Sequence, residues 1–444
     1  MPGQIGGSSL GVTTYGGASP LSAPLAPGTR PVFQLLAALD TTPLQLPVWT
    51  DITEWMDDSP ITTAAGFDDD LQHLAAAGTM TLRLRDPDRT FDPSNVAGPF
   101  YGKLKPWNGI RLAATYAGLT TNLFTGFVRR WPQNFDAGQR RTTVNITAVD
   151  ITAWLALEST EPRNVFTLDD PVLGQLDVGN QLLGVVSFEE QTSGARITQI
   201  LDRIGMPKWM RKIDQGRTWL KAHTPDDASV LPYFEQIVAS EAGHMYVNGD
   251  GQLVFEERHH ARSDPTQSGP TLWLTDDRIA DIDYQPSDDR ALRNWIERAS
   301  EGGARSIASD QASIDLYGRK RDSRTDLLFA NPAEAADQAR WVRDLLSQPI
   351  DRIDPIVIDP TFDSTHLFPV VLASTVHRRF NVVHTPSGVG DPVDVDLHIR
   401  HVQHQIAGLS WRTTVQTTPV DDRPIFTLDD PVYGLLDAGN LVSY

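Results

Sequence analysis

RTTVNITAVD at residues 141–150 and RTTVQTTPVD at residues 412–421 agree at 7 of 10 positions, and both have the composition of a β-strand. Threonine and valine are common in strands, and alternation of apolar and polar residues indicates a strand with one buried face. Each stretch ends a region of short strand-like segments. The pair therefore predicts two related β-domains, one early in the chain and one at its end.

A second repeated phrase follows each of these strands. FTLDDPVLGQLDVGN at 166–180 and FTLDDPVYGLLDAGN at 426–440 are identical at 12 of 15 positions. The phrase combines apolar residues with Asp-Asp-Pro and Gly/Asn turn signals, and it is too short to form its own core. Its surroundings are acidic, with six acidic and one basic residue in 161–194, and five acidic and one basic residue in 421–444.

These properties predict two arms that dock on a surface of their own domain or of a neighbouring copy, for example by adding a strand to a sheet edge. The alternative for the aspartates is a calcium loop, but the ligand spacing of an EF-hand is absent. We therefore expect an assembly interface, carried by Phe166, Leu168, Asp169, Asp170, Pro171, Leu176 and Asp177 in the first copy and by Phe426, Leu428, Asp429, Asp430, Pro431, Leu436 and Asp437 in the second.

Composition narrows the class of protein. A chain of 444 residues predicts two to four domains, and zero cysteines exclude disulfides and thiolate metal sites. The formal charge of -19 argues against specific nucleic-acid binding, which needs a basic face, although an acidic surface would let DNA pass without sticking. No apolar run approaches the length of a membrane span, and the N-terminus lacks the features of a signal peptide.

Composition and periodicity divide the chain into seven parts. The fold class that they predict is mainly β with an α+β insert, in which two related β-barrel or sandwich domains flank smaller α+β modules. The expected parts are a flexible or extended N-terminal arm (1–30), a first β-domain (31–160), the first acidic arm (161–192), a helix pair with a β-hairpin (193–260), a strand-rich central module that ends in a helix (261–350), a second β-domain (351–421) and the second arm (422–444).

Within these parts, several elements are specific enough to test. Residues 48–56 are expected to be a strand, as are WIERASE at 295–301 and ASIDLYG at 312–318. Ser193 is expected to cap a helix, and Asn331 is expected to cap another with Pro332 at its first position. The run Asn248–Gly251 is a strong hairpin signal.

The chemistry-bearing patterns do not combine into a catalytic or cofactor site. His398, His401 and His404 lie in a strand-like run where neighbours three apart face opposite sides, so zinc binding is not expected. A Gly-x-Ser-x-Gly match at 7–11 lies in the Gly-rich N-terminus, away from the strand and helix that a nucleophile elbow needs. We expect no enzyme activity, no cofactor and no metal.

The order of several motifs resembles that of minor tail proteins of long-tailed siphophages of actinobacterial hosts, which are similar to tail-tip and baseplate hub proteins. The motifs are DITEWM (51–56), TLRLRDPDRTFDPSNVAGPFYGKLKPWNGIRL (81–112), NLFTGFVRRW (122–131), ITAVD (146–150), ITQILDRIGMP (197–207), HMYVNGDGQLVFEER (244–258), SIDLYGRK (313–320), ADQARWVRDLL (336–346) and the LDDP-x-x-G-x-LD phrase. The Gly-rich leader has no counterpart, and no lytic domain is appended.

This resemblance implies a virion protein at the distal tail tip, made in the host cytoplasm, that forms a homotrimeric ring and continues a sixfold tail tube with two β-domains per chain. It implies contacts with the distal tail protein, the tape-measure protein and receptor-binding proteins, passage of DNA, and only indirect contact with the host envelope. The alternative function is binding of a host receptor or carbohydrate through exposed loops such as residues 86–102.

Overall fold

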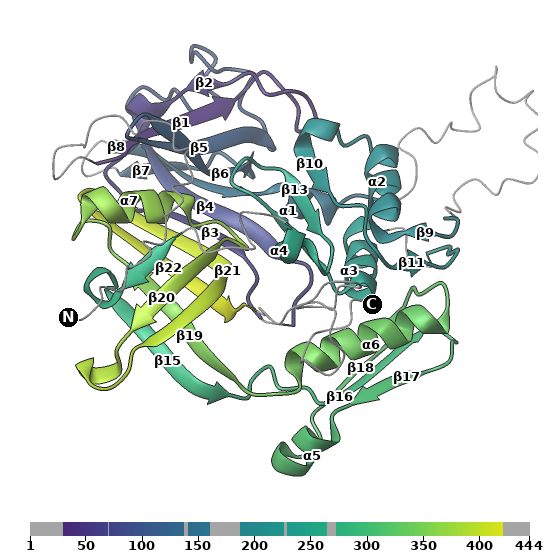
Figure 1. Ribbon diagram of the computed structural model, residues 1–444. Coiled ribbons are helices and arrows are strands. Elements are labelled where there is room, and N and C mark those ends of the chain that lie inside the picture. The colour runs from purple at the N-terminus through teal and green to yellow at the C-terminus, as the bar shows by residue number, and fades with distance from the viewer. Residues whose placement is uncertain are drawn as a thin grey trace, which may run out of the picture.

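A 14-stranded sheet runs through the computed structural model, which describes residues 30–69, 71–136, 141–159, 187–225, 229–263 and 272–420 (Figure 1). The chain is mainly β, and two smaller mixed modules are attached to the strands of this sheet, as the sequence predicts. Within the described ranges, no helix is long and apolar enough to cross a membrane.

The first β-domain contributes eight strands. They are β1 (Val32–Ala38), β2 (Thr50–Asp51), β3 (Ile61–Gly66), β4 (Ala76–Arg85), β5 (Asn108–Tyr116), β6 (Leu119–Val128), β7 (Gln133–Asp136) and β8 (Arg141–Val149). The expected strand at 48–56 is largely wrong. Only β2 forms a strand there, with an isolated bridge from Met56 to Leu84, because the Asp51 carboxylate accepts the Thr53 backbone N–H at 2.9 Å and starts a 3₁₀ turn at Thr53–Trp55.

A helical module follows the first domain. Its elements are α1 (Ile151–Leu155), β9 (Gln191–Thr192), α2 (Ser193–Arg203), η3 (Lys208–Met210), β10 (Arg211–Ile213), β11 (Trp219–Leu220), α3 (Val230–Glu241), β12 (His244–Val247), β13 (Leu253–Glu256) and α4 (His260–Ser263). The predicted hairpin at 248–251 is confirmed, but Thr192 rather than Ser193 is the N-cap of α2. The Ser193 hydroxyl instead donates to the buried Glu241 carboxylate at 2.7 Å, which ties α2 to α3.

The second module is a three-stranded sheet with helices. It comprises β16 (Trp295–Ser300), β17 (Ser306–Ser309), α5 (Gln311–Tyr317), β18 (Arg321–Leu327) and α6 (Pro332–Leu346). The Asn331 cap is confirmed, because its side chain accepts from the backbone N–H groups of Ala333 and Glu334. The expected strand at 312–318 is wrong: this stretch forms α5, since the Asp310 side chain caps it by accepting the Ser313 N–H at 3.1 Å.

The second β-domain starts earlier in the sequence than residue 351. Its elements are β14 (Trp273–Thr275), β15 (Asp281–Asp288), β19 (Ile350–Ile358), α7 (Ser364–Ala373), β20 (Arg379–His384), β21 (Val393–Ala407) and β22 (Ser410–Pro419). β14 pairs with β20 and β15 pairs with β19, so the module of β16–β18 and α6 is an insertion between two strands of this domain. No sequence pattern predicted α7.

The two β-domains have the same strand order. In the first domain neighbouring strands run β3-β4-β8-β6-β5, and in the second they run β15-β19-β22-β21-β20. β8 and β22, the strands with the shared RTTV sequence, occupy the same place in each. The inference of two related domains from that sequence therefore agrees with the fold.

One apolar core joins the two domains. Tyr116 of β5 lies 5.3 Å from Phe368 of α7 between ring centroids, and Phe33 of β1 lies 5.3 Å from Trp411 of β22. The Tyr116 hydroxyl donates to the Ser364 carbonyl at 2.8 Å. α7 thus fills the space between the domains, and burial of its apolar face links them.

Candidate assembly surfaces

The two β-domains are joined by a direct strand pairing, here called the junction. Residues 401–406 of β21 pair antiparallel with residues 61–66 of β3, from His401 opposite Gly66 to Ile406 opposite Ile61. An ideal Cβ on Gly66 would lie 2.1 Å from the Arg400 carbonyl oxygen, so this close approach requires glycine. The junction makes one continuous sheet from domains that lie far apart in the sequence.

β7 is the first-domain counterpart of the part of β21 that forms the junction. In the repeated strand, Val144 of β8 corresponds to Val415 of β22. Gln133 is opposite Val144, and Val402 is opposite Val415, so β7 matches residues 402–405 of β21. Among the described residues, β7 pairs only with β8, and its other edge has no strand beside it.

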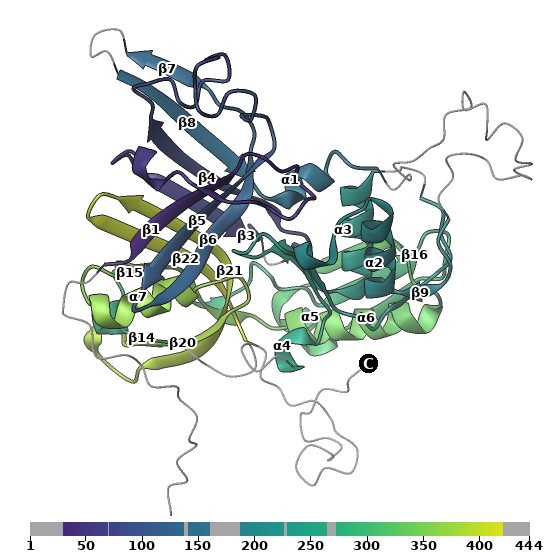
Figure 2. The ribbon, with the colours of Figure 1, turned by 90° about the horizontal axis from the view of Figure 1, so that it is seen from above.

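The opposite edge of the sheet is β15. It corresponds to β3, because β3 pairs with β4 as β15 pairs with β19 in the shared strand order. In the described part of the chain β15 has one strand neighbour, β19. Among the described strands with a single neighbour, β7 and β15 are therefore the ones equivalent to the two strands already paired in the junction (Figure 2).

An exposed sheet face crosses both domains and the junction, and it is almost free of acidic groups. The residues opposite one another across five adjacent strands are Arg412, Gln405, Thr62, Thr81 and Thr147. All but the half-buried Thr62 are exposed. The next row on the same face has Thr414, Gln403, Ala64 and Thr79. Hydroxyl, amide and methyl groups dominate this surface, rather than the acidic groups expected from the overall charge.

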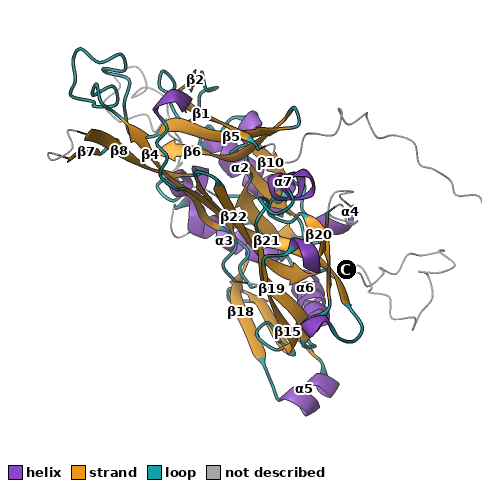
Figure 3. Cartoon of the chain, turned by 90° about the vertical axis from the view of Figure 1, so that its left-hand side faces the viewer, coloured by secondary structure: helices purple, strands orange, loops and turns teal. Residues whose placement is uncertain are grey.

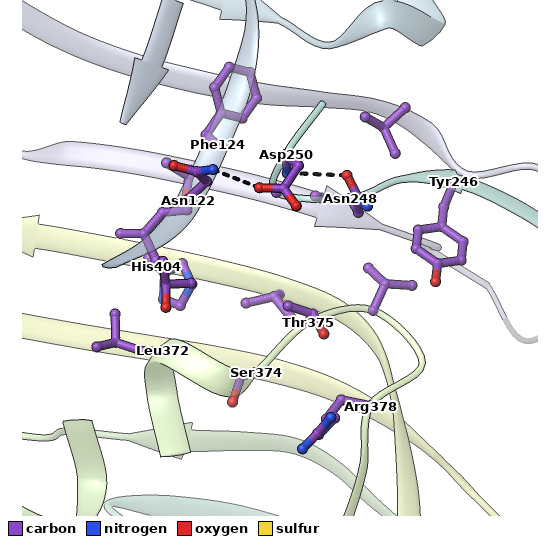
Figure 4. A pocket seen from close by; sticks show the side chains of 18 of the residues that line it. Asn122, Phe124, Tyr246, Asn248, Asp250, Leu372, Ser374, Thr375, Arg378 and His404 are labelled. Carbon is purple, nitrogen blue, oxygen red and sulfur yellow. Dashed lines mark hydrogen bonds between the residues drawn. The ribbon is translucent and has the colours of Figure 1, made fainter. Parts of the chain in front are cut away.

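A cleft of about 400 Å³ lies where the first domain, the β12–β13 hairpin and the second domain meet (Figure 4). The hairpin is held on β6 because the Asn122 amide donates to the Asp250 carboxylate at 2.6 Å and the Thr125 hydroxyl donates to the Gly249 carbonyl at 2.8 Å. The cleft is therefore the seam between three parts of the chain.

The serine and histidine of the cleft are not paired for catalysis. The Ser374 hydroxyl donates to the Val370 carbonyl at 2.8 Å. His404 Nδ1 lies 2.9 Å from the Thr413 hydroxyl and 3.4 Å from the Trp411 indole nitrogen. A nucleophile and its base must be in hydrogen-bond reach of each other, and these two side chains are bonded elsewhere.

A buried cluster of histidines holds the hairpin against the second domain. His377 Nδ1 lies 2.5 Å from the Glu256 carboxylate, which also accepts the Tyr246 hydroxyl at 2.8 Å, and the His377 ring lies 4.7 Å from that of His244. Burial opposes the charge of Glu256, but His377 outweighs it and holds the pKa of this carboxyl well below its usual range. Burial lowers the pKa of His73, on the first domain, to about 4.

The repeated arms, residues 166–177 and 426–437, lie outside the described residues, so the predicted interface on them stays a prediction. In the loop 86–102, the alternative host-binding surface, Phe91 is buried and packs on Trp55 at 5.5 Å and on Trp131 at 5.8 Å, while Tyr101 is 50% exposed. The RTTV repeat indicated two related domains, and it thereby gave a partial sequence signal for the open edges β7 and β15. The β3–β21 junction had none, because pairing between distant strands leaves no local pattern.

No protein-family model and no curated protein matches the chain. Solved structures do match over most of its length. The 43 kDa tail protein of prophage MuSo2 from Shewanella oneidensis is 14% identical, with a TM-score of 0.50 over 87% of this chain and 98% of that one. The tail protein from Neisseria meningitidis MC58 is 10% identical, with a TM-score of 0.51 over 87% of this chain and 96% of that one.

A third similar structure is the Escherichia coli c3393 protein, a type VI secretion component described as similar to the bacteriophage T4 tail proteins gp27 and gp5. It is 9% identical, with a TM-score of 0.43 over 90% of this chain and 80% of that one. At these identities the comparisons show the fold alone, and that fold is the one seen in phage tail proteins.

Proposed function

We propose that this chain is a structural protein of a phage tail, and that it forms the hub at the tail tip. The observation that carries the proposal is the junction together with its two open counterparts. The second domain pairs with the first domain of its own chain through β21 and β3. The chain also presents the equivalent strands β7 and β15, so β7 of one copy can pair with β15 of another.

Such a contact is head-to-tail, and a head-to-tail contact produces either a closed ring or a filament. Closure with three copies gives six similar β-domains, which matches the sixfold tail tube implied by the resemblance to siphophage tail-tip proteins. In this ring, β15 of one copy lies beside β7 of the next. In the junction, His404 lies opposite Thr63. Phe135 of β7 corresponds to His404, and Gln285 of β15 corresponds to Thr63. In the ring, Gln285 of one copy therefore lies opposite Phe135 of its neighbour.

The properties of β7 support this contact. The Phe135 side chain is 65% exposed on an edge strand, where an apolar residue without a covering strand favours pairing with another chain. This sheet face would then line the inside of the ring. Its two central rows hold threonine and glutamine side chains and one cation, Arg412, and Arg83 and Arg85 lie further along β4. The central rows therefore offer phosphate little to bind, which suits transient passage of DNA.

The proposal includes the location and partners implied by the resemblance. The ring lies at the distal end of the tail and closes the tube. It contacts the distal tail protein, the tape-measure protein and receptor-binding proteins, and it has no catalytic activity of its own. Cell-wall hydrolysis by the purified protein in a zymogram would contradict this last part.

Disulfide trapping tests the ring directly, since the natural chain has no cysteine. The variant Phe135→Cys/Gln285→Cys should form intermolecular disulfides on mild oxidation, because opposite residues of paired strands bring their Cβ atoms within bonding range. The products should form a ladder that ends at three linked chains of 49.0 kDa each.

The matched control is Phe362→Cys/Gln285→Cys, since Phe362 is 76% exposed and lies between β19 and α7 of the second domain. A protein that stays at the mass of one chain at high concentration, or crosslinking that is equal in the control, would overturn the proposed ring. A ladder that continues beyond three chains would replace the ring by a different closure number or a filament.

A further inference from the structure

The sheet of the second inserted module has one covered face and one open face. Ile296 of β16 and Ala308 of β17 pack with Trp341 of α6, which covers the first face. The second face, here called the open face, carries the alternate residues of the same strands, and α6 lies on the other side of the sheet (Figure 3). Its members are Trp295, Glu297, Arg305, Ile307, Arg319 and Arg321.

The open face combines apolar surface with positive charge. Ile307 is 54% exposed, and Trp295 is half-buried beneath the Arg319 guanidinium, whose central carbon lies 4.1 Å from the ring centroid. Glu297 is buried at the centre and is bonded by Arg305 at 2.8 Å and by Arg321. Two arginines thus bind one carboxylate and a third lies over Trp295, on a chain whose formal charge is -19.

The two ion pairs leave much of each arginine available. The side chains of Arg305 and Arg321 are 65% and 55% exposed although both bond to Glu297. The Arg321 hydrogen bond lowers the pKa of Glu297, so this carboxylate stays charged and keeps the two guanidinium groups in place. A guanidinium fixed in this way can bind a further carboxylate with little loss of side-chain entropy.

The C-terminal segment of the same chain has the complementary composition. Residues 421–444 carry five aspartates and one arginine, and they place Phe426 and Leu428 directly before Asp429 and Asp430. Apolar residues two apart share one side of an extended chain, which suits contact with Ile307 and Trp295. The adjacent aspartates suit the arginines.

The place where the segment begins also fits. Val420 donates its backbone N–H to the Asp396 carbonyl at 3.0 Å, at the end of β22. Close to this point, the Arg352 guanidinium donates to the Thr417 carbonyl at 3.3 Å. Arg352 belongs to β19, which begins at Ile350 where the inserted module ends, so the C-terminal segment begins near this module. The 24 residues that follow can span at most about 80 Å, several times the roughly 10 Å radius of gyration expected for a module of this size.

We propose that the open face of the β16–β18 sheet is the docking site of the C-terminal repeat, residues 421–444. Phe426 and Leu428 contact Ile307 and Trp295, while Asp429 and Asp430 bind Arg319 and Arg321. This inference does not depend on the ring, because the segment of the same chain or that of another copy satisfies it.

Peptide binding tests the docking site. A chain that lacks residues 421–444 leaves the open face free to bind a labelled synthetic peptide of that sequence, measured by fluorescence anisotropy. Binding should weaken at least tenfold in the variant Arg319→Glu, and it should weaken as salt is raised, since the contact joins opposite charges. A peptide with Asp429→Asn and Asp430→Asn should bind with a similar loss.

The chain offers a matched control in Arg129, which is exposed and lies over the half-buried Trp107 at 5.1 Å. The variant Arg129→Glu makes the same charge change at the same kind of stack and should leave peptide affinity unchanged. Equal weakening in both variants, or no binding of the peptide, would overturn the docking site. Because neither variant alters β7 or β15, the trapped trimer would still form if docking failed.

Discussion

His404 provides a direct measure of how a buried histidine affects the junction. Its side chain is 4% exposed on β21, opposite Thr63 of β3, and burial alone lowers its pKa to about 4. Its Nδ1 is an acceptor for the Trp411 N–H at 3.4 Å and lies 2.9 Å from the Thr413 hydroxyl. A proton at Nδ1 would oppose the indole donor, so the folded junction favours the neutral ring.

The sign of the pH effect follows from linkage. In the unfolded chain the histidine pKa is about 6.5, so between that value and about 4 the unfolded state binds a proton that the folded state does not. The contribution of His404 to stability is complete above about pH 6.5 and is lost as pH falls toward about 4. At about 1.36 kcal/mol per pH unit, the loss of this contribution to stability between about pH 7 and pH 4.5 amounts to about 2 kcal/mol.

The variant His404→Gln removes the titrating group and keeps a polar side chain for Trp411 and Thr413. Urea denaturation followed by tryptophan fluorescence should show that the variant loses about 2 kcal/mol less stability than the natural chain between about pH 7 and pH 4.5. The matched control His366→Gln changes an exposed histidine of α7. The reasoning is refuted if His404→Gln and the natural chain lose the same stability on acidification.

Three further predictions concern the seam, the histidine cluster and the exposed sheet face. In Gly249→Val the new Cβ would lie 2.1 Å from the Asn122 carbonyl oxygen, so the hairpin should lift from β6 and become sensitive to limited proteolysis. The variant Asp250→Ala removes one side-chain hydrogen bond and should lower the free energy of unfolding by only about 1 kcal/mol. His377→Gln should cost about 3 kcal/mol, measured by urea denaturation, because the buried Glu256 carboxylate loses its ion pair with His377 while it still accepts the Tyr246 hydroxyl. Adding Glu256→Gln should recover part of that loss, and no recovery would show that the pair is not the cause. If the sheet face lines the ring, Thr81→Lys should slow DNA release from assembled virions, as followed by a DNA-binding dye, because it adds a cation that phosphate can bind. Thr81→Gln should leave the rate unchanged, and equal rates in both variants would place this face elsewhere.

The inserted module shows where local sequence is sufficient and where it is not. The helix α6 was predicted with its cap, because Asn331 and Pro332 act through the backbone of their own first turn. The stretch 312–318 was predicted as a strand, but the Asp310 cap and the buried Ser313, whose hydroxyl donates to the Ser347 carbonyl, favour a short helix. That second contact joins residues 34 apart in the chain, which no local pattern encodes.

By itself, the sequence determined the existence of two related β-domains, since the RTTV strands repeat a pattern that depends only on alternation and strand propensity. It also determined α6 with its Asn331 cap and the β12–β13 hairpin. Only the tertiary structure decided that β15 belongs to the second domain, that β3 and β21 form the junction, and that β7 and β15 remain as open edges. The physical reason is that strand pairing between distant segments is set by which backbone edges meet after packing, and those edges have no sequence period of their own.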